Sequence, residues 1–196
     1  MLPQAQAVLD FWFGPADDPG HRQTRPQWFG KDAAFDALIG QRFGTLIEQA
    51  LIGGIAHWVA PPLAALPALA QLIVLDQFTR NAFRGSARAY AGDAMALQTA
   101  RALVASGLDR ELTGVQRLFA YLPFEHAEDL AHQRTAVQLF GQLGQDEPAR
   151  AGLLEWARRH HDVVARFGRF PHRNAALGRA SSAEEMEFLQ QPGSGF

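Results

Sequence analysis

The chain contains no cysteine, which excludes disulfides, thiolate nucleophiles and thiolate metal sites. Long apolar runs are also missing. The longest, residues 60–75, is interrupted by three prolines and Gln71 and is shorter than the roughly 20 residues that a membrane-spanning helix needs. The first 14 residues lack the basic leader and apolar block of a signal peptide. We therefore expect a soluble cytoplasmic protein with no membrane partner.

The chain has little excess charge of either sign, with a formal net charge of -2 over 196 residues. A sequence-independent nucleic-acid binder needs a basic surface, so we expect no nucleic-acid partner. Lysine is nearly absent, because Lys31 is the only lysine among 18 basic residues. Arginine suits bidentate recognition of anions, although a GC-rich coding sequence also explains the bias. The length and the 47% hydrophobic content fit a single domain, residues 1–196, with one core.

Four motifs that carry familiar chemistry are absent. The chain has neither a Gly-rich phosphate loop nor a dinucleotide-binding fingerprint, and neither a Gly-x-Ser-x-Gly elbow nor a His-Glu-x-x-His zinc helix. These absences remove the common routes to nucleotide binding, serine hydrolysis and zinc proteolysis. We expect no cofactor.

The pattern of apolar residues is helical throughout, without convincing alternating strands. It predicts an all-α protein, built as an irregular array of antiparallel helix pairs. Ser181 and Ser182 precede Glu184 and Glu185 at capping-box spacing. Four glycines stand where helices are predicted to end: Gly53, Gly107, Gly144 and Gly168. Predicted helices cover residues 3–13, 31–52, 67–83, 87–106, 110–121, 126–143, 150–167 and 182–190, with a long loop at 14–30 and a tail at 191–196.

Polar residues interrupt the apolar faces of three predicted helices. Asp76 and Arg80 continue the apolar stripe of helix 67–83, four residues apart, at a spacing that permits an ion pair. This helix is apolar nearly all round, so we expect it to be central. The stripe of helix 126–143 carries Glu125, Asp129 and His132 beside Leu139, Phe140 and Leu143, and that of helix 150–167 carries Trp156 and His160.

Buried carboxylates need partners, because an uncompensated ion in a low dielectric costs several kcal/mol. We predict that Asp76, Glu125 and Asp129 are met by some of four arginines: Arg80, Arg84, Arg169 and Arg173. The network then either locks helices together or keeps spare donors for a carboxylate or phosphate. The predicted ligand-binding residues are Asp76, Gln77, Arg80, Asn81, Arg84, Arg169, His172, Arg173 and Asn174.

Other roles stay open at this stage, including whether the protein is an enzyme. The candidate acid and base residues for an enzyme acting on a small anionic substrate are Glu125, Asp129, His126 and His160. Alternatively, the helical array offers a groove to a peptide or protein partner, with the ions as scaffold. A weak metal-ligand pattern comprises Glu125, Asp129, His132 and His160, but the surrounding arginines favour neutralisation without a metal, so we predict none. The sequence leaves the oligomeric state open.

Several ordered motifs together resemble the bacterial family of domain of unknown function number 924. They are VLDFW at 8–12, DQFTRNAFRG at 76–85, LPFEHAED at 122–129, FGRFPHRN at 167–174, LGR at 177–179 and PGSGF at 192–196, where Gly195 departs from an expected serine. The resemblance implies an all-helical, tetratricopeptide-like fold and an uncharacterised activity. It therefore supports the fold more than the function.

Overall fold

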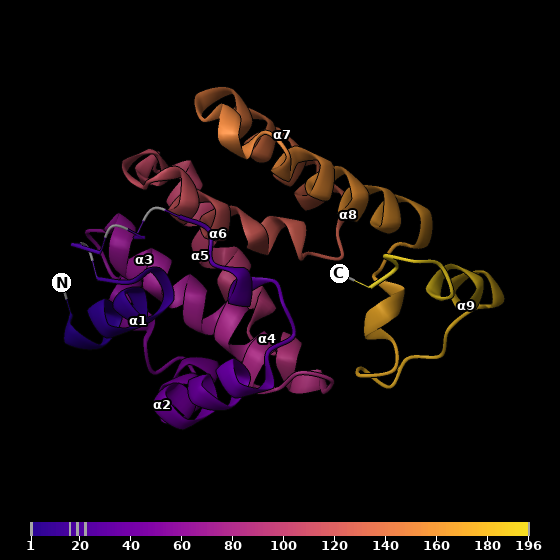
Figure 1. Cartoon of the computed structure of the whole chain (residues 1–196), viewed down its shortest axis with the longest axis horizontal. Helices are drawn as coiled ribbons and strands as arrows, with labels where there is room; N and C mark the ends of the chain where they lie inside the picture. The colour runs from indigo at the N-terminus through magenta and orange to yellow at the C-terminus, as the bar shows by residue number, and fades with distance from the viewer. Residues whose placement is uncertain (1, 16, 19, 22, 196) are drawn as a thin grey trace. The chain divides into compact units, whose positions relative to one another are not determined.

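The computed structural model describes residues 2–15, 17–18, 20–21 and 23–195, and within these residues the regular elements are helices with no strand (Figure 1). The all-α prediction is confirmed. Backbone contacts group the chain into two compact units, residues 1–84 with 88–123 and residues 85–87 with 124–196, which are described in turn. The predicted single domain and the tetratricopeptide-like arrangement stay predictions. Positions 16, 19 and 22 of the predicted loop and 196 of the predicted tail lie outside the described residues.

The first unit is built on one long helical segment that changes its hydrogen-bonding pattern midway. α3 (Ala65–Leu72) continues into a π-helical segment, η3 (Ile73–Phe78), and then into α4 (Thr79–Ala82). α1 (Pro3–Phe13) and α5 (Asp93–Ala105) pack against α3, and α2 (Ala33–Leu51) packs against η3 and α4. The remaining elements are α6 (Gly114–Glu125), which runs across the border between the units, and four 3₁₀ turns: η1 (Pro26–Trp28), η2 (Ala56–Val59), η4 (Ala87–Tyr90) and η5 (Leu108–Glu111).

The helical segment 65–82 is central to its unit, as its sequence predicts. Every residue from Ala68 to Thr79 is buried. The hydroxyl of Thr79 donates to the carbonyl oxygen of Leu75 at 2.8 Å. Gly92, just before α5, lies so close to this turn that a Cβ there would stand 2.9 Å from the carbonyl carbon of Leu75. The absence of a side chain at Gly92 therefore lets α5 begin directly against η3.

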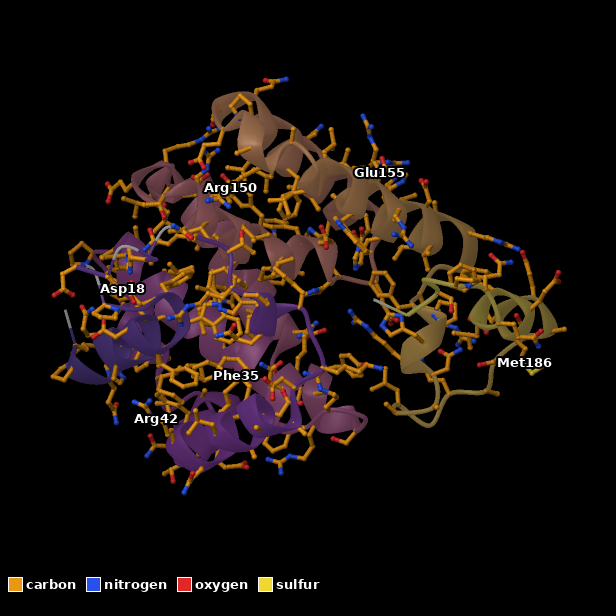
Figure 2. All side chains as sticks on the ribbon, in the orientation of Figure 1. Asp18, Phe35, Arg42, Arg150, Glu155 and Met186 are labelled. Carbon is orange, nitrogen blue, oxygen red and sulfur yellow. The ribbon has the colours of Figure 1, made fainter. Side chains whose placement is uncertain are left out.

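Aromatic rings fill the core of the first unit. Trp12 meets the rings of Trp28, Phe78 and Phe119 at centroid distances of 5.4–5.8 Å. Its neighbour Phe13 lies 5.5 Å from Phe119. Offset and edge-to-face contacts of this kind add to the apolar area that the rings bury. Figure 2 labels Phe35 on α2. The ring of Phe35 stacks on that of Phe11 at a centroid distance of 5.5 Å and extends the same cluster.

The second unit contains a helical hairpin and a short C-terminal helix. α7 (Leu130–Asp146) and α8 (Leu153–Phe167) lie side by side, joined through the 3₁₀ turn η6 (Pro148–Arg150) (Figure 1). Another 3₁₀ turn, η7 (Pro171–Arg173), and α9 (Ala183–Leu189) follow. The hairpin buries Ala136, Leu139, Phe140 and Leu143 of α7, and a smaller apolar cluster joins Val163, Val164 and Phe170 to Phe167 and Phe188.

Three of the four glycines that were predicted to end helices do so. Gly53, Gly107 and Gly168 have φ angles of 82°, 75° and 70°, a left-handed conformation that suits glycine at a helix C-terminus. The prediction for Gly144 is wrong, because α7 continues to Asp146. Gly144 instead allows close packing, since a Cβ there would lie 3.0 Å from the Cα of Ala151. The capping box is confirmed at Ser182 and Glu185.

α7 confirms most of the predicted helix 126–143, but the prediction that Glu125 and Asp129 lie on one face of it is wrong. Glu125 ends α6, whereas Asp129 caps the start of α7 by accepting hydrogen bonds from the backbone N–H groups of Ala131 and His132 at 2.9 and 3.0 Å. Asp129 is therefore exposed, and Gln133, not His132, is the fully buried residue of that turn.

The prediction for Trp156 is also wrong, because this residue lies outside the core. Its side chain is 50% exposed, and the guanidinium of Arg159 lies over its ring at 4.7 Å. Figure 2 marks two further exposed residues of this unit, Glu155 on α8 and Met186 on α9. None of the helices in the described part of the chain is both long enough and apolar enough to cross a membrane.

Candidate functional site

In the first unit, Arg80 joins two carboxylates. Its Nη1 lies 3.1 Å from Asp76 Oδ1, which confirms the predicted i, i+4 pair, and its Nη1 and Nη2 donate to the two oxygens of Asp93 at 2.7 and 3.1 Å. Asp76 is 1% exposed and also accepts from Gln77 Nε2 at 2.6 Å. The Asp76–Arg80 pair thus ties the π-helical segment to the first turn of α5.

Arg84 pairs with an acid that is outside the predicted network. Its Nε and Nη2 donate to Asp36 of α2 at 2.7 and 2.9 Å, and Nη2 also donates to Asn81 Oδ1 at 3.3 Å. Asp36 and Asp93, which sequence reasoning missed, both lie in the first turn of a helix. Acidic residues are common there because they stabilise helix N-termini, so the position alone did not indicate an arginine partner.

In the second unit, Arg169 and Asn174 meet at Glu185. Arg169 Nε and Nη2 donate to Glu185 at 2.6 and 2.8 Å, and Asn174 Nδ2 donates to the same carboxylate at 3.3 Å. Hydrogen bonds from Arg169 and from the backbone N–H of Ser182 lower the pKa of Glu185 to about 2. Sequence reasoning recognised Glu185 as a capping residue but did not predict that it is also the partner of Arg169.

A second arginine, Arg179, extends this network to Glu128. Arg179 Nη1 and Nη2 donate to Glu128 at 2.6 and 2.8 Å, and its Nε donates to Asn174 Oδ1 at 2.9 Å. Glu128 also accepts from the backbone N–H of Phe170 at 2.7 Å. Partial burial acts to raise the pKa of Glu128, but the hydrogen bonds from Arg179 and Phe170 outweigh it, and the pKa lies below its ordinary value. These contacts hold segment 168–182 in place.

A different group of ionisable residues surrounds Phe170, which is fully buried. The guanidinium of Arg173 lies over the ring at 4.5 Å, and the rings of His160 and His172 both lie 5.6 Å from it. His126 lies 6.4 Å from His160, measured between ring centroids. Glu125 contributes a carboxylate whose Oε1 is 3.4 Å from Nδ1 of His160. We call this group the Phe170 cluster: His160, His172 and Arg173 in contact with Phe170, and Glu125 and His126 next to His160.

The Phe170 cluster joins elements that are separate in sequence. Glu125 and His126 stand at the end of α6, His160 in α8, and His172 and Arg173 in η7. Glu125, His160 and Arg173 are 4–5% exposed, while His126 and His172 are half-buried. The cluster therefore combines residues predicted as acid or base candidates with two residues predicted to bind a ligand.

His160 is held in one orientation and without charge at neutral pH. Its Nδ1 lies 2.9 Å from the carbonyl oxygen of Trp156, one helical turn earlier, which makes Nδ1 the protonated nitrogen of the neutral ring. Burial, and then the positive charges of His126, His172 and Arg173, together lower the pKa of His160 to about 3. This imidazole is therefore a weak base at neutral pH.

The predicted metal pattern is not assembled. Asp129 caps α7 on the surface, and the ring of His132 packs against Phe124 at 6.1 Å, whereas Glu125 and His160 lie together in the Phe170 cluster. Among the described residues, no group of three or more His, Asp or Glu side chains is arranged to hold a metal ion.

Comparison with family models matches residues 8–193 to the family described as "Bacterial protein of unknown function (DUF924)". The chain belongs to this family. Among solved structures, the DUF924 chain is similar to the protein of unknown function ATU0120 from Agrobacterium tumefaciens, with 40% sequence identity and a TM-score of 0.80. The match covers 95% of this chain and 96% of that chain. No curated protein matches.

Proposed function

We propose that the Phe170 cluster binds a small anion that carries a carboxylate or phosphate group. The observation that carries the proposal is that two imidazoles and one guanidinium contact a single buried ring, and that a third imidazole, His126, lies 6.4 Å from one of them. Arginine and histidine side chains recognise oxyanions through charge-assisted hydrogen bonds, which are among the stronger ones. Ionisable groups with displaced pKa values also concentrate at functional sites.

Two other arginines of the second unit make the contacts that hold segment 168–182 and α9 in place, which makes them poorer candidates for an anion site. Arg169 and Arg179 each make a two-pronged contact with a carboxylate, Glu185 and Glu128 respectively. An anion would have to displace those carboxylates to bind there.

Proton uptake would make the cluster positive. Arg173 is permanently positive and balances a negative charge on Glu125, so each imidazole that takes up a proton adds a net positive charge. An anion next to these groups gains attraction that is screened less than at an exposed surface, because much of the cluster is buried.

The proposal is tested by thermal unfolding in the presence of single anions. Sulfate, phosphate, acetate and succinate are titrated separately, and a binding anion raises the melting temperature in a saturable way, because a ligand that prefers the folded state stabilises it. Arg173→Gln and His172→Gln should abolish or strongly weaken this rise. A flat response of the wild-type protein to the whole panel would contradict anion binding.

Arg166→Gln is the matched control. Arg166 belongs to the same unit and pairs with Glu184 at 2.8 Å, but it is half-exposed and lies outside the Phe170 cluster. Its loss removes one positive charge from the unit while keeping every member of the cluster. The anion response should persist in Arg166→Gln, and equal losses in Arg166→Gln and His172→Gln would indicate a general effect of net charge.

An acid–base enzyme is the second candidate function, favoured by the Glu125–His160 contact. A carboxylate beside Nδ1 of a histidine is an arrangement that orients catalytic imidazoles. The low pKa of His160 argues against a strong general base at neutral pH, because an effective base has a pKa near the working pH. Turnover of a small anionic ester that is lost in His160→Asn and kept in His161→Asn would favour the enzyme over simple binding.

A further inference from the structure

We infer that anion binding at the Phe170 cluster is coupled to proton uptake by its imidazoles. This inference rests on the proposed anion site and adds that the site binds an anion together with protons. The geometry that supports it is the short spacing of three titratable rings. The centroid of His126 lies 6.4 Å from that of His160, and the centroids of His160 and His172 each lie 5.6 Å from that of Phe170.

Without a ligand, the positive members of the cluster oppose the protonation of His160. A proton on His160 meets the charges of His126, His172 and Arg173, and it also enters a buried environment. Both effects disfavour the charged imidazole, and the pKa of His160 lies far below its ordinary value as a result. In the empty cluster His160 is therefore held without a second proton at neutral pH.

A bound anion reverses this balance. An oxyanion beside the cluster attracts each imidazolium and offsets the repulsion between them, so the pKa of the neighbouring imidazoles rises when the site is filled. If a ligand raises the pKa of a protein group, that group takes up protons when the ligand binds. By linkage, the ligand then binds more tightly as the pH falls. Each whole proton taken up makes the affinity change by about tenfold per pH unit.

Two carboxylates and a further histidine lie near the cluster. Glu125 faces His160 from the end of α6, and Glu128, from the segment between α6 and α7, acts on Arg173. The pKa of Glu128 lies below its ordinary value, so Glu128 stays ionised above about pH 5, and arginine stays charged throughout. From α7, His132 packs against Phe124, so it is a further histidine to be controlled for. Loss of proton uptake between about pH 6 and 8 in the histidine variants of the cluster assigns the uptake to their imidazoles.

Sulfate is the appropriate probe, because it keeps both charges in this pH range and takes up no proton itself. Sulfate binding is measured by titration calorimetry at about pH 6.5, near the ordinary pKa of histidine, in buffers with different ionisation enthalpies. The expected result is an observed enthalpy that varies linearly with the buffer ionisation enthalpy, with a slope that corresponds to uptake of up to about one proton per sulfate. The dissociation constant should rise as the pH is increased toward 8.

Variants identify where the proton goes. His160→Asn keeps a side-chain N–H near the position of Nδ1, which donates to the carbonyl oxygen of Trp156, but cannot take up a proton. His126→Gln and His172→Gln remove the two half-buried rings. They test the same coupling if the His160 variant does not fold. The matched control is His161→Asn, the next residue of α8, whose Nδ1 lies 3.0 Å from Asp162 on the surface, and His132→Gln controls for α7.

Each outcome separates this inference from the proposed function. The coupling is supported if proton uptake falls in the cluster variants and stays complete in His161→Asn and His132→Gln. It is also supported if the cluster variants alone lose both sulfate binding and proton uptake. Sulfate binding with no dependence on the buffer overturns the coupling and leaves the anion site standing. Uptake that persists in all three cluster variants also overturns it, and absence of sulfate binding overturns both.

Discussion

Arg169 holds the carboxylate of Glu185 with two hydrogen bonds, Nε to Oε1 at 2.6 Å and Nη2 to Oε2 at 2.8 Å. The same carboxylate accepts the backbone N–H of Ser182 at 2.7 Å, which caps α9. One side chain thus fixes the start of α9 to the residue that follows the end of α8. Fork-like contacts between arginine and carboxylate are stronger and more directional than contacts between neutral groups.

The Glu185 contact predicts a stability difference that depends on pH. The pKa of Glu185 is lowered from 4.5 to about 2, mainly by Arg169, so its ionised form stabilises the fold at a pH above the ordinary pKa and this contribution is lost as the pH falls through the lowered one. Glu185→Gln should therefore be less stable than wild type at pH 7, and the two melting temperatures should converge between about pH 4.5 and 2. Glu184→Gln, whose wild-type residue is half-exposed, is the control and should stay close to wild type at every pH.

The Asp76–Arg80 pair predicts a large loss of stability on truncation. Asp76→Ala leaves Arg80 with Asp93 but removes the acceptor of Gln77, so unfolding in urea should show a loss of about 3 kcal/mol, as expected when one member of a buried ion pair is removed. The comparison is Asp36→Ala, which removes the more exposed partner of Arg84 and should cost at most about 1 kcal/mol. Similar losses in the two variants would contradict a special role for the buried pair.

Gly92 and Gly44 predict opposite effects of the same substitution. In Gly92→Ala the new methyl group would overlap the backbone of Leu75, and we expect a loss of about 2–3 kcal/mol from overpacking. In Gly44→Ala, within α2, the methyl group meets no atom within 4 Å, so the higher helix propensity of alanine should stabilise the protein by about 0.5–1 kcal/mol. Chemical denaturation of both variants measures the difference, and a neutral Gly92→Ala would show that the close approach to η3 is not required.

The capping role of Asp129 predicts that its replacement lowers the stability of the fold only modestly, by less than the loss of a buried ion would. Its carboxylate accepts two backbone N–H groups at the start of α7, and the hydrogen bond from His132 is the main cause of its lowered pKa. Asp129→Ala should cost about 1 kcal/mol, as is usual for an N-cap, and Asp129→Ser should restore most of it. A loss of 3 kcal/mol or more, with no rescue by serine, would instead support the buried ion pair that the sequence suggested.

Local patterns in the sequence predicted the helices well because their causes are local. The apolar stripe of 67–83, the glycines after α2, α5 and α8, and the capping box at Ser182 each act within one or two helical turns. The π-helical segment at Ile73–Phe78 was not predicted, because one extra residue in a helical turn leaves the apolar pattern almost unchanged. The break between Glu125 and Asp129 was missed because the spacing of Asp129 is compatible both with the face of a continuous helix and with an N-cap position.

Long-range pairing was predicted only in kind. Carboxylates on apolar helix faces indicated that they meet guanidiniums, and Asp76 with Arg80 was identified because both lie on one helix. Arg84 with Asp36, Arg169 with Glu185 and Arg179 with Glu128 join residues 16 to 51 positions apart, and no local spacing distinguishes them from other pairs.

The sequence by itself determined an all-helical chain of the DUF924 family with buried charges, because helical periodicity and the need to neutralise buried ions follow from residue type and order. Only the tertiary structure decided which charges meet and that His126, His160, His172 and Arg173 gather with Glu125 around Phe170. The physical reason is that contacts between separate elements depend on how loops and helix ends direct the chain. Coulomb attraction alone does not select one partner of opposite charge over another. The partner is selected only when the path of the chain brings two charged side chains close together.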